Sequence, residues 1–457
     1  MAELKLPIDR EMNELLELGD RIVKMARDRG GADLVAECVL RSGAELSAKV
    51  RKGEPELVEE AGTRSAGLRV IQGKRVASTS TSDLTDHGIE RFVADAIELV
   101  GLSQEDPFAG PADPKLLSDP GSAPDLDLYD PAGGAVDAAR AIALAKEGEE
   151  AAFAFDSRIT NSEGATFGRN AGGSAMVLSS GFRAWMKGSY QSLTVVPVAA
   201  DEGGKNRRGY HWTARRHLAE LDPPAEVGRE AARRTLRKLG ARTVPTCEAP
   251  VVFDPDAARS ILGMLAGCAM GSAIWRKSSY LVGREGTRVA SDLVTVVDDP
   301  LLKRAPGSRP FDGEGLASRR NVVVERGMLR TYLCDSYSAR KLGLKTTGNA
   351  GGVHNLIATA PGHVVAIAEL LKQAGSGLYV TELMGQGVNP VTGDYSRGAS
   401  GFWVESGSLA YPVHEITIAG NLRDMYRNIV ALGDDVDRRG SIHTGSVLVG
   451  EMTIGGE

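Results

Sequence analysis

A chain of 457 residues is too long for one ordinary hydrophobic core, so we expect two or three compact units. Its 54 basic and 60 acidic residues give a net charge of −6, with both signs scattered along the length, which argues against nucleic-acid binding through a basic face. The four cysteines lie far apart without a CxxC pair, a usage typical of reduced thiols in a cytoplasmic protein. The N-terminus is charged, and the longest apolar stretch, residues 261–274, is too short and glycine-rich to span a bilayer, so we expect neither a signal peptide nor a membrane anchor.

Residues 1–103 are predicted to form an N-terminal α+β domain. Apolar residues at helical spacing between Glu11 and Arg29 predict an amphipathic helix, and a second helix is expected over Gly88–Leu102. The next segment, 104–131, carries proline, glycine and aspartate without periodicity and is predicted to be a linker. Between the two helices we expect four strands, at Asp33–Leu40, Ala44–Arg51, Gly67–Ile71 and Arg75–Ser80.

Residues 132–240 are predicted to form a middle α+β region that packs with the N-terminal domain, with helices over Gly134–Phe153 and Pro224–Leu239. Residues 241–457 are predicted to form a β-rich C-terminal domain with helices over Pro255–Trp275 and Leu422–Leu432. The fold class is therefore α+β, a helix-and-sheet domain followed by a β-rich domain. The strands expected after residue 157 are Arg158–Thr160, Gly173–Ser180, Arg183–Val198, Ala249–Phe253, Leu293–Val297, Asn321–Glu325, Gly377–Glu382, Ser400–Val404 and His414–Ala419.

Motifs for nucleotide and metal chemistry are mostly missing. Neither GxxxxGK[ST] nor GxGxxG occurs, so nucleotide binding is not indicated. The single His-Glu pair, His414-Glu415, sits in a strand-like run without a second histidine nearby and is interpreted as an exposed strand pair. Acidic pairs that begin at Asp298 and Asp312 flank turns, where carboxylates commonly cap backbone groups, and this reading is favoured over a divalent-ion site.

Candidate nucleophiles are equally weak. Ser338 and Lys341 form an SxxK match, but the SDN and KTG motifs that accompany such a site in serine hydrolases are absent. Cys268 lies among alanine, glycine and methionine, without a neighbouring base to lower its pKa. A small buried thiol is the expected role of this cysteine.

Several long strings resemble the TldD/PmbA family. The resemblance implies two subunit types that assemble together, a TldD-like type with an HExxxH zinc helix and a PmbA-like (TldE) type without it. It also implies that the assembly degrades unfolded peptides and processes peptide precursors. The strings are GLRVIQGKRVASTSTSDL (67–84), RKSSYL (276–281), DLVTVVDDPLL (292–302), SRPFDGEG (308–315), LRTYLCDSYSARKLGLKTTGNAGG (329–352), GLYVTELMGQGVNPVTGDYSRGASGFWVESG (377–407), YPVHEITIAGNLRDMYRNIV (411–430) and RRGSIHTGSVLVGEMTIGG near the end.

At the place of the zinc helix, this chain carries LGMLAGCAMGSAIW (262–275), which contains no histidine. The resemblance puts Leu265, Ala266 and Met270 where the first histidine, the glutamate and the second histidine would stand. Leucine, alanine and methionine neither ligate zinc through nitrogen or oxygen nor abstract a proton from water. The TldD type also supplies a cysteine ligand near its C-terminus, whereas no cysteine follows Cys334 here. We therefore expect no catalytic residue and no cofactor in this chain, with zinc held only by a TldD-like partner.

The glycine-rich run GQGVNPVTGDYSRGASG (385–401) has two interpretations of equal weight. It can be a pair of turns that join strands, or it can contact a peptide or a partner. In the second case we expect Tyr395 and Arg397 to be exposed beside a strand edge that accepts an extended peptide. The candidates for peptide or partner binding are Asn389, Tyr395, Ser396, Arg397 and Gly398.

The leading hypothesis is a non-catalytic subunit of a TldD-type metallopeptidase assembly. Its expected partners are a TldD-like zinc subunit and unfolded peptides, with a homodimer when the chain is alone, and neither nucleic acid nor a membrane. Two alternatives stay open. The first is a metallopeptidase or other hydrolase in its own right, with unconventional ligands drawn from Asp298, Asp312, His354 and His414. The second is a homodimeric peptide-binding module without a TldD-like partner.

Overall fold

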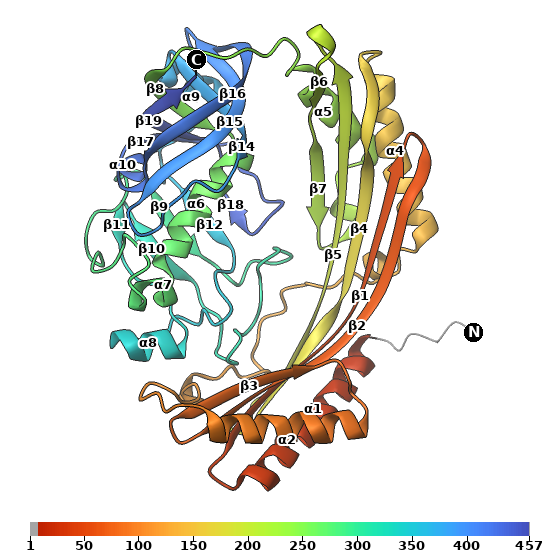
Figure 1. The fold of residues 1–457 in the computed structure, drawn as a ribbon, viewed down its shortest axis with the longest axis vertical. Helices are drawn as coiled ribbons and strands as arrows, with labels where there is room; N and C mark the ends of the chain where they lie inside the picture. Colours follow the sequence, from red (N-terminus) through yellow and green to blue (C-terminus); the bar gives the residue numbers. More distant parts are fainter. Residues whose placement is uncertain (1–7, 457) are drawn as a thin grey trace.

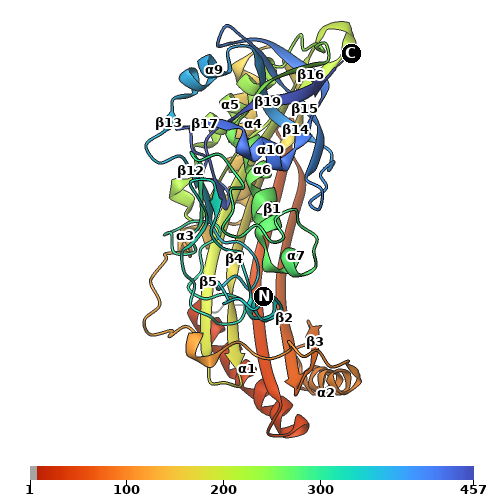
Figure 2. The same ribbon diagram turned by 90° about the vertical axis from the view of Figure 1, so that its left-hand side faces the viewer.

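The computed structural model describes residues 8–456. One half of the molecule is a long antiparallel sheet in the strand order β3-β2-β1-β4-β5-β6, with β7 also paired to β5 (Figure 1). Because β1 pairs with β4, the segments before and after the predicted linker share this sheet. Its long strands run along the longest axis of the molecule (Figure 2). The strands are β1 (Val35–Arg51), β2 (Glu54–Gln72), β3 (Arg75–Thr81), β4 (Ile159–Leu178), β5 (Arg183–Ala200), β6 (Asn206–Arg208) and β7 (His211–Arg215).

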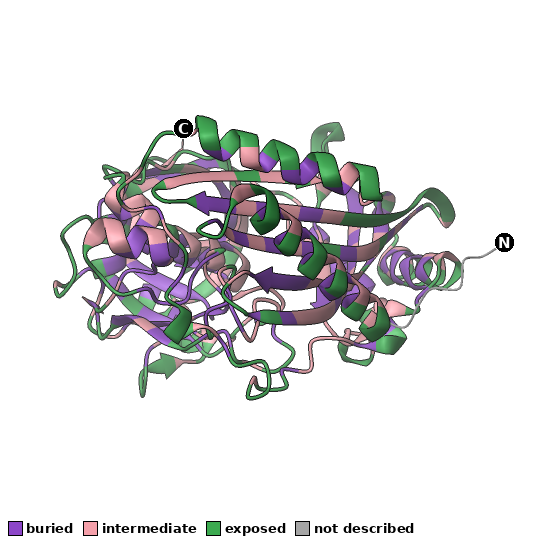
Figure 3. Cartoon of the chain, turned by 90° about the horizontal axis from the view of Figure 1, so that it is seen from below, coloured by how far each residue is buried: buried purple, intermediate pink, exposed green. Residues whose placement is uncertain are grey.

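Two pairs of helices cover the same face of this sheet. Helices α1 (Ile8–Gly30) and α2 (Asp86–Leu102) pack at one end, where Cys38 and Leu40 of β1 are buried. Helices α4 (Ala138–Phe155) and α5 (Pro224–Leu236) cover the other end, where Ala48 of β1 is buried. Alternate residues of a strand point to the same side, so these even-numbered positions of β1 define one continuous helix-covered face. The helices turn their exposed residues outward and their buried residues to the strands (Figure 3).

The other half contains a small closed barrel. Strand β8 pairs with β14 on one side and with β19 on the other, so β8, β14, β15, β16 and β19 close into a ring. A second sheet has the order β11-β10-β9-β12-β18, and one apolar core joins it to the barrel and to α6. The strands are β8 (Cys247–Phe253), β9 (Thr295–Asp298), β10 (Asn321–Glu325), β11 (Met328–Leu329), β12 (Leu356–Thr359), β13 (Val364–Val365), β14 (Gly377–Met384), β15 (Asp394–Glu405), β16 (Ser408–Asn421), β17 (Ile429–Gly433), β18 (Ile442–His443) and β19 (Val447–Gly455).

The helices of the C-terminal half are short. The longest is α6 (Pro255–Ala269), which directly follows β8. The others are α7 (Gly271–Trp275), α8 (Ser336–Leu342), α9 (Ile367–Ala374) and α10 (Leu422–Arg427), and α3 (Pro131–Gly134) precedes α4 in the other half. Across residues 8–456, no helix combines the length and the apolar character needed to cross a bilayer.

A buried ionic network joins the two halves. Asp256 at the start of α6 pairs with Arg234 of α5 and with Arg439, in both cases at 3.3 Å. Arg439 also donates to the carbonyl of Trp212 in β7 at 2.7 Å, and its own carbonyl accepts from the hydroxyl of Tyr190 in β5. Arg234 also pairs with Glu230 and Arg439 with Asp437, so several partly buried ion pairs together fix how α5, α6 and the segment around Arg439 are arranged.

The α+β fold class is confirmed, with a helix-and-sheet region followed by a β-rich remainder. The predicted boundaries at residues 103, 131 and 240 stay predictions. Several element predictions were wrong in detail. The strands expected on either side of Gly43 are one strand, β1, and those expected at Arg158–Thr160 and Gly173–Ser180 are one strand, β4. The helix expected over Pro255–Trp275 is interrupted at Met270, whose backbone is extended, and so forms α6 and α7. The helix expected over Leu422–Leu432 gives way to β17 after Arg427.

Candidate functional site

Helix α6 contains the residues that the resemblance puts at the zinc-helix position, and the local sequence explains how this helix begins. Asp254 caps the helix by accepting a hydrogen bond from the amide of Ala257 at 2.8 Å, and Pro255 stands at the first helical position, where no amide donor is needed. Leu265 and Ala266 are buried, at 1% and 2% exposure, and pack in the core between the barrel and the second sheet. Met270 ends the helix and is half-buried.

The donor set on α6 does not fit zinc. Zinc requires imidazole, thiolate or carboxylate ligands that converge on one ion, and the positions at Leu265, Ala266 and Met270 offer none of these. The thiol of Cys268 is buried, and burial raises its pKa, which disfavours the thiolate form that binds metal. Within residues 8–456, no group of three or more histidine, cysteine, aspartate and glutamate residues is arranged to hold a metal ion.

Buried tyrosines surround the C-terminal half of α6. The hydroxyl of Tyr426 donates to the carbonyl of Ile261 at 2.6 Å, which fixes α10 against α6. Tyr395 packs in the same core, and its burial raises its pKa to about 12, although Arg397 opposes the shift. The expectation that Tyr395 is exposed was therefore wrong, because only 2% of this residue is accessible. Its neighbour Ser396 points to the other side of β15 and is exposed, as strand alternation requires.

The remaining candidates lie around the turn before β15. Asn389 is exposed, and its side-chain oxygen accepts from the amides of Val391 and Thr392, so it organises the turn. Arg397 is half-buried and reaches the hydroxyl of Ser260 on α6 at 3.4 Å. The structure therefore brings Arg397 to the N-terminal half of α6, and the role of these residues in binding stays a prediction.

The strand edge expected beside Arg397 is occupied. Gly398 pairs with Met384 of β14, and Ser396 donates its amide to the carbonyl of Gly387 at 2.7 Å. The other side of β15 pairs with β16 along its length. This part of the barrel consequently lacks the open backbone donors and acceptors that an added peptide strand needs.

Of the unconventional ligands proposed for a hydrolase, two meet in space. His354 Nδ1 lies 2.8 Å from Asp298 Oδ2, and Asn349 donates to the same carboxylate oxygen at 2.7 Å. Both members of the pair are inaccessible to solvent, and Asp298 also accepts from the amide of His354, so the cluster orders the loop between α8 and β12. Asp312 accepts three backbone amides, which is the predicted turn chemistry.

The weaker candidates have structural roles as well. His414 lies 3.1 Å from a guanidinium nitrogen of Arg207 and is mostly covered, whereas Glu415 is exposed. Ser338 sits at the start of α8, where its amide and hydroxyl both donate to Asp335. Lys341 turns away from Ser338 to pair with Asp106 at 3.5 Å, so it does not activate that hydroxyl.

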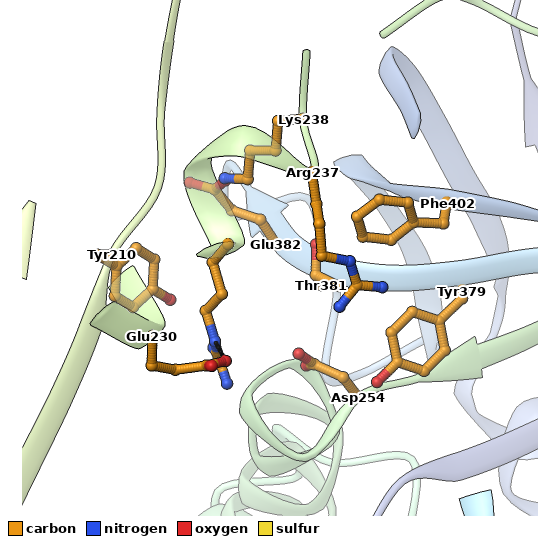
Figure 4. Close-up of a pocket in the computed structure, with 10 residues that line it drawn as sticks. Tyr210, Glu230, Arg237, Lys238, Asp254, Tyr379, Thr381, Glu382 and Phe402 are labelled. Atoms are coloured by element: carbon orange, nitrogen blue, oxygen red, sulfur yellow. Dashed lines mark hydrogen bonds and ion pairs between the residues drawn. The ribbon is translucent and has the colours of Figure 1, made fainter. Parts of the chain in front are cut away.

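A small cavity of about 90 Å³ lies at the N-terminal end of α6, between α5 and the barrel (Figure 4). Asp254 from α6 and Arg237 from the end of α5 reach toward the same space. Arg237 stacks on the ring of Phe402 with 4.4 Å between guanidinium and ring centre, while Lys238 pairs with Glu382 at 2.8 Å on the rim. The cavity thus joins both halves of the molecule.

Asp254 is the perturbed group of this cavity. Burial raises the pKa of its carboxyl from 3.8 to about 7, and the carboxylates of Asp256 and Asp435 push in the same direction. The amide of Ala257 and the guanidinium of Arg234 oppose the shift only in part. This side chain can therefore exchange a proton near neutral pH. Asp254 was not among the residues predicted from the sequence, although an Asp-Pro pair at the start of a helix is a capping signal.

Three family models cover most of the chain. Residues 36–100 match PmbA/TldA metallopeptidase domain 1, residues 132–239 match the central domain, and residues 246–456 match the C-terminal domain. "Metalloprotease PmbA" of Escherichia coli O157:H7 is 43% identical over 422 residues, which are 92% of this chain and 92% of that protein.

Solved structures agree with the sequence matches. One is the crystal structure of a "putative modulator of DNA gyrase" from Bacteroides thetaiotaomicron. It matches with 28% sequence identity and a TM-score of 0.90, and the match covers 97% of this chain and 99% of that one. The crystal structure of TldE from Thermococcus kodakarensis shares the fold with a TM-score of 0.81 at 19% identity, over 97% of this chain and 100% of that one.

The fold and these matches place the chain among proteins whose family models and relatives are named for metallopeptidases. The chain belongs to the PmbA/TldD family.

Proposed function

We propose that this chain is a non-catalytic, PmbA/TldE-like subunit of a TldD-type metallopeptidase assembly that acts on unfolded peptides and peptide precursors. The observation that carries the proposal is the composition of α6. A chain that matches the family from residue 36 to residue 456 presents Leu265, Ala266 and Met270 where metal ligands and a general base belong. The partner subunit supplies zinc and the activated water, and this chain supplies surface that completes the assembly.

The packing of α6 supports a structural role for this helix. Leu265 and Ala266 lie in the apolar core, so the helix holds the barrel and the second sheet together. Met270 is followed by Gly271, whose amide donates to the carbonyl of Leu333 at 2.7 Å. A side-chain carbon at Gly271 would stand 2.6 Å from the sulfur of Cys334, so the close approach of α7 to α8 requires glycine.

The test combines metal analysis with reconstitution. The purified chain should hold no stoichiometric zinc and should not cleave an unfolded peptide, whereas mixing it with a TldD-like subunit should give hydrolysis. Substitution of the HExxxH glutamate of that subunit should abolish the activity of the mixture, because only that side chain activates water. The proposal fails if this chain alone cleaves peptides as fast as the mixture, or if it loses one bound zinc together with activity on chelation.

A matched pair of variants tests the contact surface. Ser396→Glu puts a charge on the exposed side of β15 beside Arg397, and it should weaken co-assembly or peptide binding by about tenfold. Ser408→Glu makes the same change at an exposed position on the far end of the β15–β16 hairpin and should leave both unchanged. If the two variants have equal effects in a co-purification titration, Ser396 does not belong to the contact surface.

A further inference from the structure

A pocket on the C-terminal half is surrounded by four arginines. The segment between α7 and β9 supplies Arg284 and Arg288, and α10 supplies Arg423 and Arg427. The cavity measures about 60 Å³, which leaves room for a group of a few heavy atoms. Its floor consists of Tyr280, Leu281 and Val289.

Specific contacts hold α10 and the segment between α7 and β9 together around the pocket. Arg427 donates from Nη2 to the carbonyl of Arg288 at 3.2 Å, which ties α10 to the facing segment. The guanidinium of Arg423 lies 5.7 Å from the ring centre of Tyr280, so the ring supports this side chain from below. Tyr280 is in turn anchored by its amide, which donates to the carbonyl of Pro390 at 2.8 Å.

The four positive charges lack internal counterions. All four arginines are exposed, and within residues 8–456 none of them makes an ion pair with a carboxylate. Glu285 and Asp424 are the adjacent acidic residues, and neither contacts the four guanidinium groups as an ion pair. Like charges four residues apart on a helix destabilise it, so the spacing of Arg423 and Arg427 is unfavourable unless an anion offsets it.

We propose that this pocket binds an oxyanion, either the carboxylate of a peptide or a free phosphate group. The guanidinium fork matches the planar or tetrahedral oxygen pairs of such groups, and it forms charge-assisted hydrogen bonds with them. The small volume admits one such group while the attached chain stays outside. The site lies apart from the Asp254 cavity and does not depend on hydrolysis or on a partner subunit.

Isothermal titration at constant ionic strength tests the proposal with three probes. They are inorganic phosphate, an unfolded peptide with a free C-terminal carboxylate, and the same peptide as its C-terminal amide. Phosphate binding assigns the pocket to phosphate, and tighter binding of the free acid than of the amide assigns it to a peptide carboxylate. In either case the double variant Arg423→Gln/Arg427→Gln should weaken binding by at least about tenfold.

A control variant separates the pocket from general charge. Arg10→Gln/Arg91→Gln removes the same charge from exposed positions on α1 and α2 and should leave binding unchanged. The proposal is overturned if neither phosphate nor the free acid binds, or if both double variants weaken binding equally.

A melting curve tests whether the pocket variant folds normally. Without an anion and at low salt, Arg423→Gln/Arg427→Gln should melt at the same or a higher temperature than the parent, because it relieves repulsion. Phosphate should then raise the melting temperature of the parent and not that of the variant. A rise of equal size in both proteins would contradict the pocket.

Discussion

The carboxyl of Asp254 should make the protein less stable as the pH rises from about 4 to about 7. In the folded protein its pKa is raised from 3.8 to about 7, mainly by burial. Between these two values the folded state holds a proton that the unfolded state has released, so the free energy of unfolding falls with rising pH and levels off above pH 7. A shift of this size corresponds to roughly 4 kcal/mol.

Asp254→Asn should remove this dependence. An asparagine oxygen can still accept from the amide of Ala257, which preserves the helix cap at the start of α6. The variant should already exceed the parent by roughly 2 kcal/mol at about pH 5, where the folded parent is protonated and the unfolded parent is ionised, and by roughly 4 kcal/mol at about pH 8.5, where both states of the parent are ionised.

The assay is denaturant unfolding of both proteins at the two pH values, followed by a probe in the C-terminal half. Asp137→Asn, at the exposed cap of α4, controls for the change from aspartate to asparagine in a cap. Parallel pH profiles of the parent and of Asp254→Asn would refute the assignment of a buried, uncompensated carboxyl at this position.

Further predictions concern the contact between the two halves and the packing of α6 and α7. Asp256→Ala should lower stability by about 1–3 kcal/mol in thermal melts, because it removes the mostly buried carboxylate that Arg234 and Arg439 share and leaves them with Glu230 and Asp437. Glu163→Ala, which removes an exposed pair, should lower stability by less than about 1 kcal/mol. Gly271→Ala should lower the free energy of unfolding by about 1–3 kcal/mol, because the added carbon clashes with α8. Gly267→Ala adds a carbon that meets no atom within 4 Å, and it should raise the free energy of unfolding by about 0.5–1 kcal/mol. Equal melting temperatures for the two glycine variants would contradict the packing described for Gly271.

Much of the secondary structure could be predicted from the sequence because local signals agree with the fold. The helical stripe between Glu11 and Arg29 became α1, and the strand at Asn321–Glu325 has the predicted limits. The first half of β2 was missed, since Glu54–Gln72 begins with a charged run that is exposed on both sides. Such a strand is held by its backbone ladder with β1, and side-chain alternation does not reveal it.

The candidate site was predictable only where it depends on residue identity. That Leu265 and Ala266 cannot ligate zinc follows from their side-chain chemistry alone. The burial of Tyr395 was not, because whether a strand residue faces the core or the solvent depends on register, and a one-residue shift would exchange it with Ser396. The arginine pocket could not be predicted from the sequence either, because Arg288 and Arg423 come from distant segments that only the tertiary fold brings together.

Helix α6 thus connects the Asp254 cavity at its N-terminus with the arginine pocket near its C-terminus. At its N-terminus Asp254 faces the cavity between the halves, and Asp256 anchors the ionic network to α5 and β7. At its other end the carbonyl of Cys268 accepts from Ser279, the residue that precedes Tyr280 in the floor of the arginine pocket. Apolar residues in the middle let the helix pack on both sheets, which polar metal ligands at the same positions would oppose by burying unpaired groups. The apolar residues of α6 therefore hold the helix in the core and offer no ligand to a metal ion.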